Sequence, residues 1–353
     1  MIVSTSADSV RQEVDEVIEA SSNEHVSVII PCYNEERFIG KALQNLADQY
    51  DNSIYEIIVV DGMSNDGTRE VIAQFRQQHP DLSVQVVDNP ARNIPSALNL
   101  GIAAARGNFI LRMDAHAVPS RGYVRRCVDL LARGSAAVIG APCHVCPGAD
   151  TLMARAIAVA VSHPFGIGDA KYRIRNGNVS QEPVDTVAFG AFRKALWREL
   201  GGFNQDLLTN EDYDFNYRVR ARGGLVLLDR SEHCDYFART TLRELAAQYF
   251  RYGQWKARML KLHPQSIRWR HFVAPLFVGS LVFLGLLGFV WPAAWSLLGL
   301  ELGLYFTLGL ILGRQPDSHW VKAGLLTLLM PVVFLTIHLS WGASFFLGLS
   351  RRT

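Results

Sequence analysis

The chain has 353 residues, of which 49% are hydrophobic and 19% charged, and its formal net charge is +2. Residues 272–353 carry only six charged side chains: Glu301, Arg314, Asp317, Lys322, Arg351 and Arg352. A domain of ordinary charge content therefore precedes a long apolar segment, which excludes a wholly soluble protein, a disordered chain and a collagen-like repeat. Acidic and basic side chains balance before residue 272, which argues against nucleic-acid binding.

The first 24 residues read as a polar N-terminal tail. They contain six acidic side chains and lack the long apolar core of a signal peptide. We expect a helix from Asp8 to Ala20 within this tail.

Residues 26–113 alternate between strand and helix patterns. Apolar and β-branched runs predict strands at 26–30, 56–60, 82–87 and 108–113. Apolar residues at helical spacing predict helices at 38–46, 68–79 and 94–105. This order indicates an α/β fold with a doubly wound sheet and a ligand crevice at the carboxyl ends of its strands.

Polar residues follow the strands at these carboxyl ends, in the segments 31–35, 61–62 and 114–116. The chain has neither a G-x-G-x-x-G after its first strand nor a G-x-x-x-x-G-K-[ST] motif, so a phosphate-bearing ligand needs another cradle. Asp114 and His116 could hold a divalent cation. An aspartate that caps the following helix would give the same sequence.

Cys143 and Cys146 form a C-x-x-C that encloses His144. No second Cys or His pair at zinc-ligand spacing accompanies them in the sequence, so we interpret them as ordinary small apolar residues, with metal or redox use as the alternative. The remaining cysteines are scattered, which argues against a disulfide scaffold.

The C-terminal region predicts three hydrophobic helices. From His271 to Gly313 the only charge is Glu301, and Trp291-Pro292 marks a turn, which indicates two membrane spans. Residues 323–350 predict a third. We expect Glu301 near the membrane interface or packed inside the bundle, because a carboxylate that faces lipid is costly.

Residues 251–271 are strongly basic, with six Lys or Arg and no acid. The positive-inside rule then places the preceding domain in the cytoplasm. The segment also suits contact with anionic lipid or a pyrophosphate head group. With three spans, Arg351 and Arg352 would face outward, against the same rule.

Five longer segments resemble glycosyltransferase family 2. VSVIIPCYNEERFI, EIIVVDGMSNDGT and ALNLGIAAARGNFILRMDAH are similar to its nucleotide-sugar-binding half, and FGAFRKALWRELGGFN with TNEDYDFNYRVRARGG is similar to its acceptor half. The similarity covers about residues 25–255. With the membrane tail, the VDGMSNDGT and DAH variants look closest to exopolysaccharide glucosyltransferases of the succinoglycan-biosynthesis type.

The resemblance implies a Rossmann-like, nucleotide-sugar-binding domain of the glycosyltransferase-A type, with a central, mostly parallel sheet and C-terminal transmembrane helices. We expect four parts: the tail at 1–24, a cytoplasmic glycosyltransferase domain at 25–250, a basic amphipathic interface segment at 251–271, and a membrane domain of about three helices at 272–353.

The family inverts the anomeric centre by single displacement, and Mg²⁺ or Mn²⁺ usually neutralises the leaving diphosphate. Asp114 and His116 stand at the family's D-x-D positions, which makes them the implied metal ligands. Histidine at the second position suits Mn²⁺ better than Mg²⁺. The alternatives are helix capping by Asp114 and contact of His116 with the diphosphate.

The same resemblance implies the contacts to the nucleoside. Asp61 matches the aspartate that binds it, although Gly62 stands where many members have a second aspartate. Pro31, Tyr33 and Glu35 match the loop that borders the base, where Tyr33 could stack and Glu35 could accept a hydrogen bond. Glu35 also suits the first turn of a helix.

Four further residues are implied substrate contacts. Arg92 could supply the positive charge that many members place where Leu98 stands, or it could be a solvated loop residue. Gly190 would let the backbone approach the donor. Membrane-bound members often carry Q-x-x-R-W, and we compare residues 251–255 with this motif. Arg251 could reach the diphosphate, and Trp255 could support a sugar. A plain interface helix explains these two residues as well.

Glu211 and Asp212 match the acidic pair of the acceptor half. The resemblance makes Asp212 the general base and Glu211 a neighbour that shapes the site. Asp214 is expected to be an exposed helix residue. Residues 201–203 would form a tight turn beside the acceptor.

The sequence therefore predicts a multi-pass enzyme of the inner membrane that transfers a sugar, glucose first, from a UDP-sugar to a polyprenyl-linked saccharide. Other glycan-assembly enzymes are possible partners. The alternatives are a polyprenyl-phosphate sugar synthase, a processive polysaccharide synthase and an inactive membrane scaffold.

Overall fold

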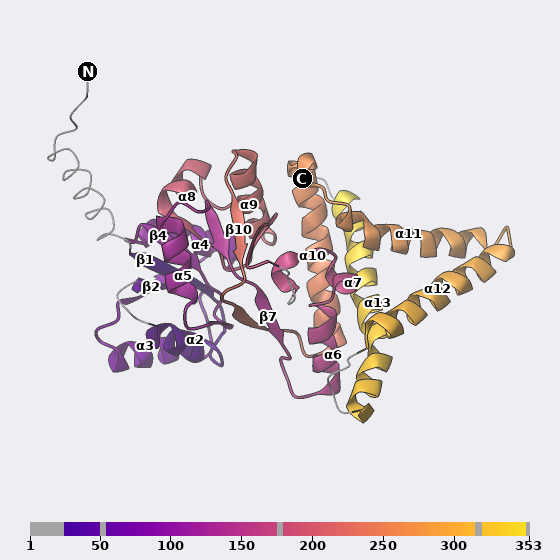
Figure 1. The fold of residues 1–353 in the computed structure, drawn as a ribbon, viewed down its shortest axis with the longest axis horizontal. Helices are drawn as coiled ribbons and strands as arrows, with labels where there is room; N and C mark the ends of the chain where they lie inside the picture. The colour runs from indigo at the N-terminus through magenta and orange to yellow at the C-terminus, as the bar shows by residue number, and fades with distance from the viewer. Residues whose placement is uncertain (1–24, 50–53, 175–178, 315–319, 351–353) are drawn as a thin grey trace, which may run out of the picture. The chain divides into compact units, whose positions relative to one another are not determined.

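The computed structural model describes residues 25–49, 54–174, 179–314 and 320–350, so the helix expected in the N-terminal tail lies outside the described residues. The chain folds into two compact units (Figure 1). We call residues 1–141, 181–203 and 218–232 the sheet unit, and residues 142–180, 204–217 and 233–353 the helical unit.

An eight-stranded sheet forms the sheet unit, in the order β3-β2-β1-β4-β9-β6-β10-β8. The strand β1 pairs in parallel with β2 and β4, and β2 pairs in parallel with β3, whereas β9 is antiparallel to β4 and β6. This confirms the predicted mostly parallel, doubly wound sheet. The strands of this unit are β1 (Val26–Cys32), β2 (Ile54–Asp61), β3 (Val84–Asp88), β4 (Phe109–Arg112), β5 (Ala117–Pro119), β6 (Val138–Gly140), β8 (Gln181–Pro183), β9 (Ala191–Arg193) and β10 (Val226–Asp229).

The central strands are continuous apolar runs, and residues 28–30 and 57–60 are completely buried. Such runs are typical of parallel strands covered on both faces. A Cβ at Gly101 would lie 2.6 Å from Cγ2 of Ile29 and 2.8 Å from Cγ2 of Val60, so this glycine allows its helix to lie close to β1 and β2. The helices of the unit are α2 (Ile39–Ala47), α3 (Thr68–Gln78), α4 (Ile94–Ala104), α5 (Tyr123–Ala132) and α8 (Lys194–Leu200).

The helical unit contains the parallel strand pair β7 (Cys143–Cys146) and β11 (Cys234–Phe237). Helix α9 (Glu211–Ala221) begins in this unit and ends in the sheet unit. The other elements are α6 (Leu152–Ala160), α7 (Pro164–Ile167), the 3₁₀ turns η1 (Lys171–Arg173) and η2 (Pro264–Ser266), α10 (Leu242–Leu262), α11 (Arg270–Leu287), α12 (Ala293–Leu312) and α13 (Trp320–Ser350).

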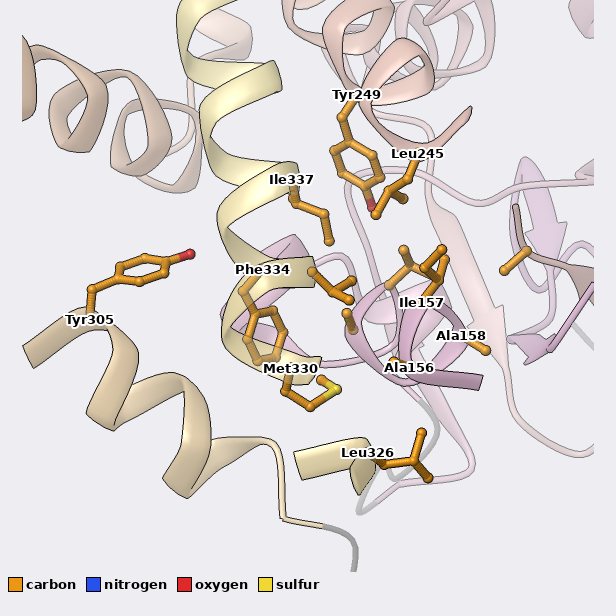
Figure 2. Packing of buried hydrophobic residues seen from close by; sticks show 14 residues of the cluster. Ala156, Ile157, Ala158, Leu245, Tyr249, Tyr305, Leu326, Met330, Phe334 and Ile337 are labelled. Atoms are coloured by element: carbon orange, nitrogen blue, oxygen red, sulfur yellow. The ribbon is translucent and has the colours of Figure 1, made fainter. Parts of the chain in front are cut away.

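One apolar cluster joins α6, α10 and α13. Figure 2 shows Ile157 of α6, Leu245 of α10 and Phe334 of α13 within it, and all three side chains are completely buried. A Cβ at Gly253 would collide with the carbonyl oxygen of Trp341, so α10 lies directly against α13. Helix α10 runs without a break across residue 250, where the sequence predicts a domain boundary. It packs on the C-terminal apolar helix α13.

Among the described residues, three helices are long and apolar enough to cross a membrane: Arg270–Leu287, Ala293–Leu312 and Gly324–Ser350. Their number and positions confirm the predicted three. Glu301 of α12 accepts a hydrogen bond of 2.5 Å from the hydroxyl of Ser280 in α11, so it is packed between two helices as expected.

Candidate active site

The loops that follow β1 and β2 are hydrogen-bonded to each other. The backbone N–H of Asn34 donates to Oγ of Ser64 at 2.9 Å, and the N–H of Glu35 donates to Oγ1 of Thr68 at 2.9 Å. The side-chain oxygen of Asn34 accepts from the N–H of Asn65 at 3.0 Å. These bonds hold together the two loops that carry Glu35 and Asp61, two of the predicted nucleoside contacts.

Asp61 is the buried centre of this arrangement. Its side chain is fully buried, and its Oδ1 accepts from the hydroxyl of Ser64 at 2.5 Å. Its Oδ2 forms an ion pair with Arg69 at 2.6 Å, and Arg69 also binds Asp88 at 2.6 Å. The sequence interpretation did not single out Arg69, although its place at the start of α3, just after the Asp61 loop, was a usable signal. The predicted contact of Asp61 with a nucleoside stays a prediction.

Tyr33 and Gly62 lie against each other. A Cβ at position 62 would lie 3.3 Å from Cβ of Tyr33 and 3.4 Å from the carbonyl oxygen of Cys32. A larger residue at position 62, such as the aspartate that many family members carry there, would therefore require a small shift of Tyr33. The Tyr33 side chain is 48% exposed, so its ring is accessible for stacking, while Pro31 forms part of β1.

Cys32 ends β1 between these residues. Burial raises the pKa of its thiol well above the usual range, and the nearby Glu35 and Asp61 raise it further. The thiol therefore stays protonated at neutral pH and is not a nucleophile.

Glu35 contacts His116, one of the two predicted metal ligands that follow β4. Nδ1 of His116 lies 3.1 Å from Oε1 of Glu35, and Oδ1 of Asp114 lies 3.4 Å from Nη2 of Arg112. The Asp114, His116 and Glu35 side chains are 24%, 30% and 21% exposed. If Nδ1 carries the proton and donates it to Glu35, Nε2 is left with a lone pair, as in a metal-ligating histidine held by an outer carboxylate. These residues thus fit a divalent ion, with oxygen atoms of a diphosphate or water completing its shell.

Removing Glu35 tests this interpretation of His116. We expect Glu35→Ala to weaken Mn²⁺ binding by about 10- to 100-fold, because loss of a carboxylate behind a ligating histidine typically costs that much. Mn²⁺ titration of the full-length protein followed by electron paramagnetic resonance measures it. Glu70→Ala, an exposed glutamate on α3, is the matched control. Unchanged Mn²⁺ affinity in Glu35→Ala would show that His116 is not held in this way.

Arg92 and Gly190 are less directly connected to these groups. Arg92 is exposed in a left-handed conformation with a φ of 53°, just before α4. A Cβ at Gly190 would lie 3.1 Å from Val138 and 3.2 Å from Val187, so the close approach at this glycine is to other protein side chains. Their contacts with a donor stay predictions.

The expected tight turn at 201–203 is present. Gly201 and Gly202 have φ values of 74° and 83°, which favour glycine. Asn99 of α4 fastens this turn, because its Oδ1 accepts from the Phe203 N–H at 2.8 Å and from the Trp197 indole at 3.0 Å. Asn99 is a positioning residue that the sequence interpretation missed.

In the helical unit, the first turn of α9 carries the acidic pair. Glu211 is buried, and Asp212 is half-buried with its Oδ1 accepting from the Tyr213 N–H at 2.7 Å. The Tyr213 hydroxyl donates to the carbonyl of Ser266 at 3.0 Å, and Nζ of Lys256 lies 3.3 Å from the Tyr213 ring centroid. These contacts anchor the turn that holds Asp212.

The expectation for Asp214 was wrong. Its side chain is 1% exposed, and its Oδ1 lies 2.8 Å from Nε2 of His263, within hydrogen-bond distance. Position 214 lies on the face of α9 that packs toward the end of α10, and the acidic run of the sequence concealed this.

Trp255 lies in the same region, in a cluster with Leu207, Tyr213 and Met259. The Arg258 guanidinium lies 5.2 Å from its ring centroid. Arg251, one turn earlier on α10, is exposed. Both remain candidates for substrate contact.

Another group in the helical unit has metal-ligand chemistry. His144, His233 and Asp235 place ligand atoms within 4.8 Å of one another, on the paired strands β7 and β11 and the residue before β11. Cys143 and Cys146 on β7 are not joined in a disulfide. In this group the possible metal ligand is His144, which the C-x-x-C encloses, and neither of its cysteines.

Comparison with known proteins agrees with this geometry. Residues 27–201 match the family model for glycosyl transferase family 2. The chain is 29% identical over 327 residues to the succinoglycan biosynthesis protein ExoA of Rhizobium meliloti, covering 90% of this chain and 93% of that protein. It is 26% identical over 332 residues to the dolichyl N-acetyl-alpha-D-glucosaminyl phosphate 3-beta-D-2,3-diacetamido-2,3-dideoxy-beta-D-glucuronosyltransferase of Methanococcus voltae, covering 92% and 97%.

The fold is similar to that of a mannosyltransferase from Pyrobaculum calidifontis solved with GDP-mannose and Mn²⁺. That match has a TM-score of 0.61 at 18% identity and covers 98% of this chain and 96% of that one. The central sheet and this structural match thus define a glycosyltransferase-A-like fold. The chain carries a glycosyltransferase family 2 domain, and its enzyme class is that of the nucleotide-sugar-dependent glycosyltransferases.

Proposed function

We propose that the protein transfers one sugar, glucose first, from a UDP-sugar to a lipid-linked saccharide with inversion at the anomeric carbon. One observation carries the proposal: the chain joins a family 2 domain, with Asp114 and His116 at a strand end, to three helices able to span a membrane. The names of the relatives support the acceptor class, since one specifies a dolichyl-phosphate sugar and the other succinoglycan biosynthesis.

In this proposal Asp212 takes the proton from the acceptor hydroxyl as that oxygen attacks the sugar, and Glu211 shapes its surroundings. Asp61, Tyr33 and Glu35 position the nucleoside, and holding both substrates in line supplies a further part of the rate. The half-buried position of Asp212 and the contacts that anchor its helical turn support the role of base.

Asp114 and His116 would hold a divalent cation, for which Mn²⁺ is the first choice. When bound, such an ion supplies charge neutralisation for the leaving diphosphate. The imidazole among the ligands favours Mn²⁺ over Mg²⁺.

We place the catalytic part at the cytoplasmic face of the inner membrane, because residues 251–271 carry six basic side chains and no acid just before and at the start of α11. Membrane lipid and other glycan-assembly enzymes are the expected partners. A polyprenyl-phosphate sugar synthase and a processive synthase are the enzymatic alternatives, and a scaffold is the non-enzymatic one.

A donor panel tests the proposal. Membranes that contain the protein, with native lipid extract, are incubated with radiolabelled UDP- and GDP-sugars, the latter because the similar P. calidifontis structure holds GDP-mannose. We expect label from a UDP-hexose to enter an organic-soluble lipid. Long polymeric products would favour the processive alternative. A lipid-linked sugar monophosphate, recognised by its charge and its cleavage in mild acid, would favour the lipid-phosphate synthase. If the protein neither transfers sugar nor binds a nucleotide, the remaining interpretation is the inactive scaffold.

A further inference from the structure

Arg173, in the turn η1 of the helical unit, is a half-buried cation without an acid. In the part of the chain that the structure describes, no carboxylate forms an ion pair with it, and its buried Nε has no hydrogen-bond partner. Its guanidinium lies 5.6 Å from the ring centroids of both Tyr172 and Tyr236. Since arginine keeps its charge in proteins, this side chain carries an uncompensated positive charge.

Phenol groups surround this charge. The rings of Tyr172 and Tyr236 flank the guanidinium. Burial lowers the pKa of Arg173, whereas the phenol groups of Tyr172, Tyr252, Tyr249 and Tyr236 raise it. Gln248 fixes two of them, because its Nε2 donates to the hydroxyl of Tyr252 at 2.9 Å and of Tyr236 at 3.1 Å. Tyr249 is 5% exposed, and its hydroxyl has no hydrogen-bond partner among the described residues. It extends from α10 beside Leu245 (Figure 2).

Stacking alone does not account for this arrangement. A cation over aromatic rings is stabilised by them, but the rings leave the in-plane Nε–H without an acceptor. A buried donor without an acceptor is destabilising. One arginine with hydroxyl donors around it matches a phosphate group, which offers several acceptor oxygens and negative charge.

We propose that Arg173 and Tyr249 bind the phosphate of the lipid-linked acceptor, which deepens the proposed function and rests on it. The location favours the acceptor as the source of the phosphate. Helix α10, which carries Tyr249, packs on the apolar helix α13, so a phosphate here would have its lipid chain beside a membrane-spanning segment. The nucleotide's diphosphate and inorganic phosphate share the chemistry and are distinguished by experiment.

The proposed base lies in the same neighbourhood. Burial raises the pKa of Tyr172 to about 12; Arg173 opposes that shift and Asp212 adds to it. Both side chains thus act on one phenol.

Binding of a prenyl diphosphate tests the site without requiring catalysis. Radiolabelled farnesyl diphosphate, farnesol, inorganic pyrophosphate and UDP are each titrated against the full-length protein in nanodiscs. We expect farnesyl diphosphate to bind and farnesol not to bind. Arg173→Gln should weaken farnesyl diphosphate binding by about 10- to 100-fold, and Tyr249→Phe by several-fold, because each removes a hydrogen bond to a charged group. UDP affinity should stay the same in both variants.

The matched control is Arg243→Gln, which removes an exposed arginine from the first turn of α10 and should leave all affinities unchanged. Thermal unfolding verifies that each variant folds, and Arg173→Lys should restore part of the binding. Unchanged farnesyl diphosphate affinity in Arg173→Gln and Tyr249→Phe would overturn the proposal. So would a selective loss of UDP affinity, which would assign the cluster to the donor, or equal binding of pyrophosphate and farnesyl diphosphate, which would leave a free-phosphate site. If the wild-type protein binds farnesyl diphosphate but transfers no sugar, the proposed function fails and this site stands.

Discussion

Asp212→Asn is expected to lower the rate of sugar transfer by about 10²- to 10⁴-fold, the contribution of a positioned general base. Asparagine keeps the size of the side chain and an oxygen that can accept from the Tyr213 N–H, so the first turn of α9 should be preserved. The loss should therefore appear in kcat for the lipid acceptor, while the affinity for the nucleotide stays the same. Initial rates with purified protein and equilibrium nucleotide binding measure the two effects.

The matched control is Asp206→Asn, because Asp206 is an exposed aspartate in the loop before α9. It should retain full activity. An Asp212→Asn protein that transfers sugar at a rate within a few-fold of wild type would show that another group takes the proton. In that case Glu211, which is buried next to it, becomes the residue to replace.

The sheet unit was predictable from the sequence because its signals are local. β-branched apolar runs such as residues 57–60 are typical of buried strands, and the order of strands and helices leaves few topologies for a parallel sheet. The antiparallel strand β9 was not foreseen, because it is three residues long and is specified by its pairing with β4 and β6.

The site was predictable where residue type and strand end coincide, and unpredictable where distant side chains meet. Asp61 follows a strand, but its partner Arg69 is eight residues away on α3. The contact of Glu35 with His116 joins residues 81 positions apart. Asp214 was mistaken for a surface residue because its partner, His263, lies beyond the end of α10. Gln248 and Arg251 have the Q-x-x-R spacing, with Tyr252 at the aromatic position, a closer match to the family pattern than residues 251–255.

Asp114→Asn and the removal of divalent cations are each expected to lower the rate of sugar transfer strongly. Chelator should abolish transfer by the wild-type protein, and Mn²⁺ should restore it better than Mg²⁺. Loss of several kcal/mol of charge stabilisation at the leaving diphosphate corresponds to about 10³-fold in rate. Asp114→Asn should show this loss at saturating Mn²⁺, whereas Asp81→Asn, an exposed aspartate of the sheet unit, should not.

The choice between the two metals depends on His116. His116→Asp creates the all-oxygen D-x-D pair, so activity in Mg²⁺ should rise relative to activity in Mn²⁺, since hard cations prefer carboxylate ligands. The ratio of the two activities reports on the ligand itself, because a general loss of stability would lower both equally. A ratio that stays constant while both activities fall would mean that His116 contacts the diphosphate or stabilises the fold and is not a metal ligand. Full activity of the wild-type protein in chelator would exclude a metal-dependent reaction, and positive side chains would then have to neutralise the leaving group.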